Sequence, residues 1–180
     1  MQLRQRRARN WFDLGEKFMR TQNYSEAVIR FNKFLSKNPD NELCLLRKAQ
    51  ALNSIDRRTE AIETYDRILK VNPRNSIAIL EKADIYSREG DYVKELETLN
   101  DFQKIHPKHK RLWYKKGLAL IKLNRLMEAK YCFNRLLFLD PRNQEALIKI
   151  KEINNLVVSK PVDSPISLRY NSESQDDGYS

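Results

Sequence analysis

Apolar side chains recur at three- and four-residue intervals through most of the chain, and short polar stretches interrupt them. This spacing predicts amphipathic helices, each with one apolar stripe directed toward a core. The polar stretches are short enough to join antiparallel helix pairs. They read RTQNYSE, NSIDRRTE, SREGDYVKE and KLNRLME. With four glycines in 180 residues, a turn-rich β-sandwich is disfavoured, and the pattern predicts an all-α fold.

The helical pattern repeats with a period of 34 residues. Four prolines mark this period, and each closes a similar phrase: SKNPDN, KVNPRN, KIHPKH and FLDPRN. Proline cannot continue the hydrogen-bond ladder of a helix, so each one is expected just after the second helix of a unit. The period therefore predicts a stack of equivalent helix pairs.

Small residues keep the same period, and we expect them where two helices approach closely. One such column comprises Gly15, Ala49, Ala83 and Gly117. A second comprises Ala27, Ala61 and Ala129, and it is broken by Glu95 in the third unit. We expect Glu95 either to reduce stability or to mark a local rearrangement, and the third unit to be the least stable.

The motifs WFDLGEKF…A…F…P in residues 11–39 and WYKKGLAL…A…F…P in residues 113–141 resemble the tetratricopeptide repeat (TPR), a 34-residue helix–turn–helix unit. The resemblance implies an α-solenoid of about nine helices with a right-handed superhelical sense. The predicted divisions are a basic lead at 1–7, four repeats at 8–41, 42–75, 76–109 and 110–143, a capping helix at 144–157, and a disordered tail at 158–180.

The stretch HPKHKRLWYKKG, residues 106–117, is unusually basic and contains two aromatic residues, as nucleic-acid surfaces often do. In the repeat register it is a joint between units. Pro107 ends one helix, Trp113 is the core tryptophan of the next unit, and Gly117 is its close-packing glycine. The register therefore predicts a structural role for these three residues.

The sequence predicts neither an enzyme nor a cofactor. It contains no Gly-rich phosphate loop, no nucleophile motif and no HExxH. His106 and His109 have no further ligands beside them, and Cys44 and Cys132 lie among apolar neighbours as buried thiols would. No apolar run approaches the ~18 residues of a membrane span and no secretory signal is present, so the chain is expected to be soluble and cytoplasmic.

Function is therefore expected on a surface. The resemblance implies a concave groove, lined by the first helix of each unit, that binds a peptide segment of a partner protein. A non-catalytic adaptor or scaffold is predicted, with a ligand that carries apolar anchors and some acidic residues. The predicted groove residues are the apolar Phe12, Leu46, Leu80, Tyr114 and Leu118 and the basic Arg47, Arg111 and Lys115. The alternative is that these apolar residues pack against adjacent helices and leave little surface exposed.

Other partners are possible from the sequence. A clamp for the acidic tails of chaperones is disfavoured. When the clamp positions are aligned from the first repeat, they hold Phe12, Glu16, Arg47, Ile77 and Glu81, none of which matches the residues that such a clamp needs. The net charge of +10 and the arginine-rich N-terminus suggest nucleic acid as a rival ligand, which requires the positive residues to form one continuous stripe. Self-association through incompletely capped ends is a further expectation.

The tail from Ser159 to Ser180 breaks the helical pattern with two prolines, six serines and a net charge of −2. It is expected to be disordered in isolation. It is interpreted either as a solubilising tail or as a segment whose apolar PISLRY stretch docks into a basic groove of this or another copy.

Overall fold

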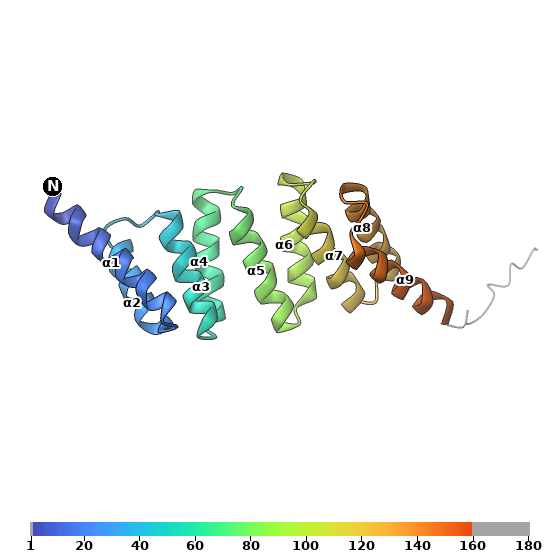
Figure 1. The fold of residues 1–180 in the computed structure, drawn as a ribbon, viewed down its shortest axis with the longest axis horizontal. Helices are drawn as coiled ribbons and strands as arrows, with labels where there is room; N and C mark the ends of the chain where they lie inside the picture. The colour runs from blue at the N-terminus through green and yellow to red at the C-terminus, as the bar shows by residue number, and fades with distance from the viewer. Residues whose placement is uncertain (1, 160–180) are drawn as a thin grey trace, which may run out of the picture.

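The computed structural model describes residues 2–159, with side-chain positions for residues 10–158. Nine helices occur in this range and follow one another along an elongated stack (Figure 1). Their bounds are α1 Gln2–Arg20, α2 Tyr24–Leu35, α3 Glu42–Ser54, α4 Arg58–Val71, α5 Ser76–Glu89, α6 Tyr92–Ile105, α7 Lys110–Lys122, α8 Leu126–Leu139 and α9 Gln144–Ser159. Each helix packs on the next in sequence. The predicted all-α solenoid of stacked helix pairs is confirmed.

Helix α1 begins at Gln2 and therefore includes residues 2–7 of the segment predicted as a basic lead. The predicted disordered tail lies outside the described residues from 160 onward. Within the described range, no helix is both long enough and apolar enough to cross a membrane.

Asparagine side chains cap the N-termini of α3, α5 and α9. The Oδ1 atoms of Asn41, Asn75 and Asn143 each accept a hydrogen bond from the backbone N–H three residues later, at 2.8–2.9 Å. Such a cap satisfies one of the amide groups that has no partner at a helix N-terminus. His109 occupies the equivalent place before α7 and makes no side-chain cap. The start of the fourth unit is therefore less well capped than its counterparts.

The turn inside each unit uses one left-handed residue. Gln22, Asp56, Gly90 and Asn124 have φ values of 57°, 62°, 75° and 56°. These positions are 34 residues apart, so the same backbone turn recurs with four different side chains. Only glycine adopts this conformation without strain.

The small residues of the first helices meet large side chains of the second helices, as the columns predicted. A Cβ atom added at Gly117 would lie 2.5 Å from Cζ of Phe133, which is closer than packed atoms approach. In the third unit the corresponding pair is Ala83 and Leu99, both fully buried. The third unit thus combines a larger residue on the first helix with a smaller one on the second, whereas the second unit pairs Ala49 with the large Tyr65.

Glu95 is buried in the alanine column of the third unit, with 2 % of its surface exposed. Its Oε2 atom has no hydrogen-bond partner among the described residues. Burial raises the pKa of this carboxyl to about 6, and a hydrogen bond with Ser87 opposes the shift. Helices α5 and α6 are both continuous here, so the predicted local rearrangement is absent and the alternative, an unfavourable buried charge, remains.

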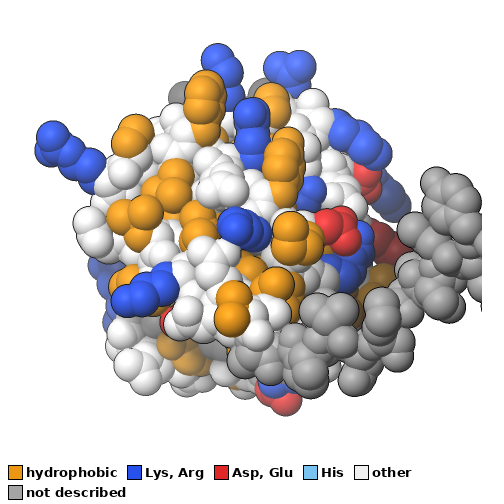
Figure 2. Space-filling model, turned by 90° about the vertical axis from the view of Figure 1, so that its right-hand side faces the viewer, with side chains coloured by type: hydrophobic (Ala, Val, Ile, Leu, Met, Phe, Trp, Pro, Cys, Tyr) orange, Lys and Arg blue, Asp and Glu red, His pale blue; other side chains and the backbone are white. Residues whose placement is uncertain are grey.

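The C-terminal end of the stack carries many exposed apolar side chains (Figure 2). Lysine and arginine side chains lie between them, and few acidic ones are visible on this face. The large apolar residues exposed on α8 and α9 are Met127, Tyr131, Phe138, Leu147, Ile148, Leu156, Val157 and Val158. One end of the molecule thus offers far more apolar surface than an ordinary solvated helix face.

Candidate functional site

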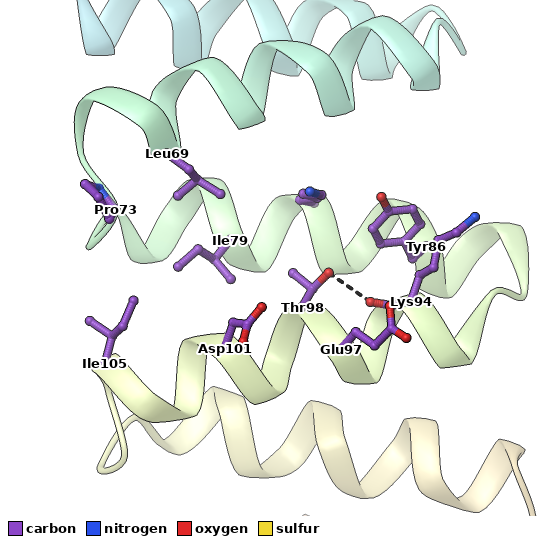
Figure 3. Close-up of a pocket in the computed structure, with 10 residues that line it drawn as sticks. Leu69, Pro73, Ile79, Tyr86, Lys94, Glu97, Thr98, Asp101 and Ile105 are labelled. Atoms are coloured by element: carbon purple, nitrogen blue, oxygen red, sulfur yellow. Dashed lines mark hydrogen bonds between the residues drawn. The ribbon is translucent and has the colours of Figure 1, made fainter.

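Two hollows lie on the outer side of the stack, between consecutive second helices. One, of about 370 Å³, lies between α4 and α6 over α5 (Figure 3). Its floor includes Ile79, Lys82 and Tyr86, and Lys82 Nζ is paired with Asp66 Oδ1 at 2.6 Å. The second hollow lies one unit further on, between α6 and α8, and contains Lys116 in the place of Lys82. Both hollows are shallow, and they recur because the unit repeats. Their lining residues do not form a recognisable catalytic or metal-binding group.

The opposite side of each first helix faces the predicted groove. On α5 this side includes Ile77, Leu80, Glu81 and Asp84, which lie at positions i, i+3, i+4 and i+7 and therefore share one face. The corresponding face of α7 includes Arg111, which contacts Asp84 directly. Contacts between neighbouring first helices therefore place these faces side by side.

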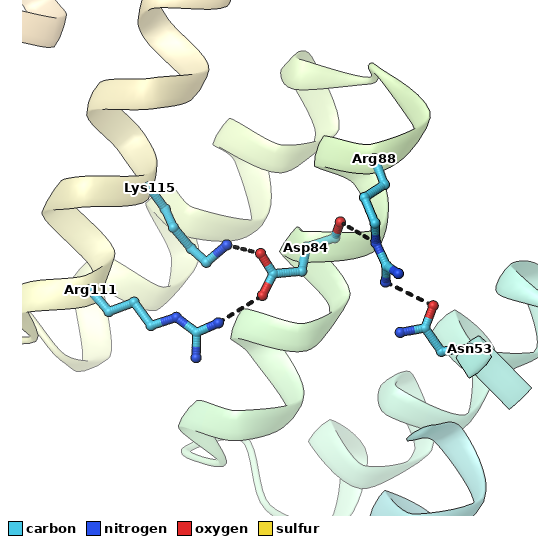
Figure 4. A network of polar contacts seen from close by, with 5 residues as sticks. All are labelled: Asn53, Asp84, Arg88, Arg111 and Lys115. Carbon is cyan, nitrogen blue, oxygen red and sulfur yellow. Dashed lines mark hydrogen bonds and ion pairs between the residues drawn. The ribbon is translucent and has the colours of Figure 1, made fainter. Parts of the chain in front are cut away.

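A chain of polar contacts crosses the groove from α3 to α7 (Figure 4). Arg88 donates to Asn53 Oδ1 at 2.8 Å and to the backbone carbonyl of Asp84 at 3.3 Å. Arg111 Nη2 lies 2.9 Å from Asp84 Oδ2, and the ammonium of Lys115 pairs with Asp84 Oδ1. One carboxylate therefore links α5 to two basic residues of α7.

Arg47 is paired in the same way at the other end of the groove. Its Nε atom lies 3.1 Å from Glu16 Oε1 on α1, and Nη1 donates to Gln50 at 3.2 Å. All three basic residues predicted to contact a ligand, Arg47, Arg111 and Lys115, thus have protein partners. Only 12 % of the Lys115 side chain is exposed, and burial lowers its pKa while the nearby Glu81 opposes the shift.

The predicted apolar anchors are buried to different extents. Leu80 is 4 % exposed and belongs to the core, so for this residue the packing alternative describes the structure. Phe12 is half-buried against Phe31 and Phe34, with ring centroids 5.8 and 5.5 Å away. Leu46, Tyr114 and Leu118 are also half-buried, and they pack on the core while keeping part of their surface in the groove.

The sequence interpretation missed two exposed apolar residues in the groove. Leu43 and Ile77 are 52 % and 50 % exposed. They are 34 residues apart, and each lies three residues before a predicted anchor, on the same helix face. The same column holds Arg111 in α7. The 34-residue register contained this column, and its two apolar members were the signal that could have identified it.

The basic stretch at residues 106–117 forms a structural joint, as its register predicted. Trp113 is buried, and its Nε1–H donates to the carbonyl of Pro107 at 2.8 Å. His106 Nε2 lies 3.0 Å from the carbonyl of Arg74, and both histidine rings contact Phe102. In the described part of the chain, no three His, Cys, Asp or Glu residues are grouped so as to hold a metal ion.

Antiparallel helix pairs stacked with a 34-residue period define a helical-repeat solenoid, a class whose chemistry lies on its surfaces. Models of the family described as tetratricopeptide repeat match residues 12–69, 46–110 and 110–143. The chain belongs to the tetratricopeptide repeat family.

Solved structures of other repeat proteins share this fold. MamA (41-end) from Desulfovibrio magneticus RS-1 superposes with a TM-score of 0.66 at 18% identity, covering 87% of this chain and 97% of its own. The first TPR domain of human RPAP3 gives 0.60 at 25% identity, with coverages of 67% and 95%. A tetratricopeptide repeat protein from Parabacteroides merdae gives 0.74 at 20% identity, with coverages of 87% and 68%. A comparison with curated protein sequences gives no match.

Proposed function

We propose that this protein is a non-catalytic adaptor that binds a peptide segment of a partner protein in its concave groove. The observation that carries the proposal is the exposure of Leu43 and Ile77 on neighbouring first helices. Two half-exposed apolar side chains beside a polar network provide the anchor and rim that peptide grooves require. Solenoids of this family typically act through protein–protein contacts.

The ligand that fits this groove has two apolar residues, one for Leu43 and one for Ile77. Half-buried Leu46 and Tyr114 extend the apolar surface beneath them. A ligand carboxylate has Arg111 as its partner, because this guanidinium is more exposed than the ammonium of Lys115. It must compete there with Asp84, so the charge contributes mainly to selectivity, and the apolar anchors supply most of the affinity.

Peptide binding fits these contacts better than nucleic-acid binding. A phosphate-binding groove needs several cations free to contact the backbone of the nucleic acid. In this groove Arg47 is paired with Glu16, and Arg111 and Lys115 are paired with Asp84. These three positive residues are therefore each held by a carboxylate of the protein, which favours a peptide ligand over a phosphate backbone.

The test is a selection of peptides from a displayed library, followed by binding titrations of the selected peptides by fluorescence anisotropy. Ile77→Glu is expected to weaken binding about tenfold or more, because it removes an anchor of the interface. The matched control is Val93→Glu, since Val93 has similar exposure (56 %) but lies on α6 outside the groove. Equal affinities of the Ile77→Glu and Val93→Glu variants would contradict the proposal, as would steep salt-dependent binding of a single-stranded oligonucleotide in place of any peptide.

A further inference from the structure

The outer side of α8 carries three large apolar side chains that the fold leaves exposed. Met127, Tyr131 and Phe138 are 68 %, 59 % and 75 % exposed. Spacings of four and seven residues place them along one side of the helix. We call these three residues the α8 stripe.

The repeat itself does not require an apolar stripe here. The equivalent positions of the other second helices hold mainly polar residues. They are Ser25, Ile29 and Ser36 in α2; Thr59, Glu63 and Lys70 in α4; and Val93, Glu97 and Lys104 in α6. The α8 stripe is therefore specific to the fourth unit, and exposed aromatic and methionine side chains in a row are typical of a contact surface.

Two opposite charges lie along one edge of the stripe. Glu128 and Arg135 are seven residues apart, which is nearly two helical turns, so their side chains leave α8 on the same side. Among residues 10–158, no carboxylate is paired with Arg135. Glu128 accepts two hydrogen bonds from Arg125, both of 2.7 Å, and a carboxylate has about four acceptor positions, so it can accept a second arginine.

Trp113 supports the stripe from below. The guanidinium of Arg135 lies 5.5 Å from the centroid of the Trp113 ring and 5.4 Å from that of Phe138. The Tyr131 ring meets Trp113 edge-on, with the centroids 6.2 Å apart. Because Trp113 is buried in the core, these side chains are held in place before any partner binds, which reduces the entropy lost on association.

The stripe is complementary to a second copy of itself. A two-fold axis that crosses α8 at right angles one residue after Tyr131, in the plane of contact, makes two such helices antiparallel and keeps equivalent edges together. It brings Met127 opposite Phe138, with a mismatch of about 1.5 Å along the helix. The same axis brings Glu128 opposite Arg135 with an equally small mismatch. The two Tyr131 side chains then lie beside the axis.

The charged pair alone would not produce this complementarity. Helix α4 has Glu60 and Arg67 at the equivalent positions, but Glu63 stands in the place of Tyr131. Two copies of α4 brought together in the same way would place like charges beside the axis, which is unfavourable. Among the four second helices, only α8 combines the charged pair with apolar residues at all three positions of the stripe.

We propose that two copies of this protein associate through the α8 stripe, with the two α8 helices antiparallel and Glu128 of each copy paired with Arg135 of the other. Three large apolar side chains per copy are few beside the about 20–30 residues that a standard interface uses on each side, so the dimer is weak and dissociates on dilution. The stripe lies on a second helix and the predicted groove on the first helices, so this proposal does not depend on the proposed function.

The first test is sedimentation velocity of the full-length chain over a dilution series. Physiological ionic strength is used, because it screens the net charge of +10 on each copy. The sedimentation coefficient is expected to rise from that of a monomer to that of a dimer as the concentration increases. Tyr131→Glu should weaken dimerisation about tenfold or more, because it places two carboxylates beside the axis. The matched control is Ile29→Glu, which changes the exposed residue at the equivalent position of α2 and should leave the dissociation constant unchanged.

The second test exchanges the charges. Arg135→Glu and Glu128→Arg should each weaken dimerisation about tenfold, because each places like charges opposite one another. An equimolar mixture of the two variants should dimerise about as well as the wild type, since every acidic side chain of the pair then faces a basic one on the other chain. Recovery in the mixture also requires both variants to be folded, so loss of structure cannot imitate this result.

Three results would overturn the proposal. A monomer that persists at millimolar concentration means that the stripe serves no second copy. A dimer that Tyr131→Glu and Ile29→Glu affect equally means that the copies meet through another surface. A mixture of the two charge variants that dimerises no better than either variant alone means that Glu128 and Arg135 do not pair between copies.

Discussion

The third and fourth units have the same backbone but differ in both their interior and their outer surface. The interior column holds Glu95 in the third unit and Ala129 in the fourth. The outer side of α6 is mostly charged, whereas that of α8 carries the apolar stripe. The repeat thus determines where the helices lie. A residue that deviates from its column marks a unit that we expect to be less stable, as at Glu95, or a helix face that differs from its counterparts, as on α8.

The largest expected effect concerns the close approach in the fourth unit. Gly117→Ala places a Cβ atom against the Phe133 ring and should lower the free energy of unfolding by about 3 kcal/mol, measured by urea denaturation. The third unit supplies the compensation, because it pairs Ala83 with Leu99. The double variant Gly117→Ala, Phe133→Leu should therefore be more stable than Gly117→Ala alone. A double variant that is less stable than the single one would refute the size-matching explanation.

Glu95 should account for a pH-dependent instability of the third unit. The folded-state pKa of about 6 exceeds the ordinary value of 4.5, so the folded state binds more protons between these values. Stability should therefore fall as the pH rises from 4.5 through 6. Glu95→Ala should stabilise the protein by roughly 2 kcal/mol at pH 7, from 1.36 kcal/mol per pKa unit, and have little effect at pH 4.

Urea denaturation at a series of pH values measures this difference. Glu97→Gln is the matched control, because it removes an exposed carboxylate from the same helix. If Glu95→Ala and Glu97→Gln gave the same change at every pH, the buried charge would not be its cause.

The junction between the two units should respond to capping. His109→Asn is expected to stabilise the protein by about 1 kcal/mol, because an asparagine side chain can accept from the N-terminal amides of α7. The backbone at His109, with φ −76° and ψ 112°, already resembles that at capped Asn75, with φ −66° and ψ 97°. Thermal unfolding measures the change, and Asn41→Ala, which removes a side chain whose described hydrogen bond is the cap to the Cys44 N–H, should shift the midpoint by a similar amount in the opposite direction. No gain from His109→Asn would mean that the contact of the His109 ring with Phe102 is equally stabilising.

The smallest effect is expected for the ion pair at the start of α8. Arg125 lies 2.7 Å from Glu128, and the hydrogen bond between them lowers the pKa of the Glu128 carboxyl. Both side chains are exposed, so solvent and salt screen the pair. Arg125→Ala should leave the urea midpoint unchanged within error. A clear loss of stability would show that this pair does more than occupy the surface.

The sequence predicted the fold almost completely, because it is a property of the 34-residue period. The succession of helices and turns and the close contacts of the small-residue column followed from this spacing. The exposure of individual groove residues did not follow. Leu80 and Ile77 are both apolar and share one face of α5, and it is the packing of neighbouring helices that buries the first and leaves the second exposed.

The charge pairing of the groove was also beyond the sequence. Arg111 reaches Asp84 of the preceding unit, although the two residues occupy different columns of the repeat. This contact depends on how far one first helix is shifted along the next. The alignment of equivalent positions in the sequence does not contain that information. The three basic residues were therefore predicted as ligand contacts without their internal partners.

The buried core divides into two clusters at α5. Ala78 and Ile85 pack with the first half of the stack, whereas Ile79 and Leu80 pack with the second, and Leu69 touches both. We therefore expect a bending or pulling force to act first at this seam, where few buried contacts join the two clusters. Leu43 lies before the seam on α3 and Ile77 lies on α5 itself, so a bend there would change the spacing of the two anchors. The proposed groove is therefore expected to adjust to peptides of different length while each half of the core stays intact.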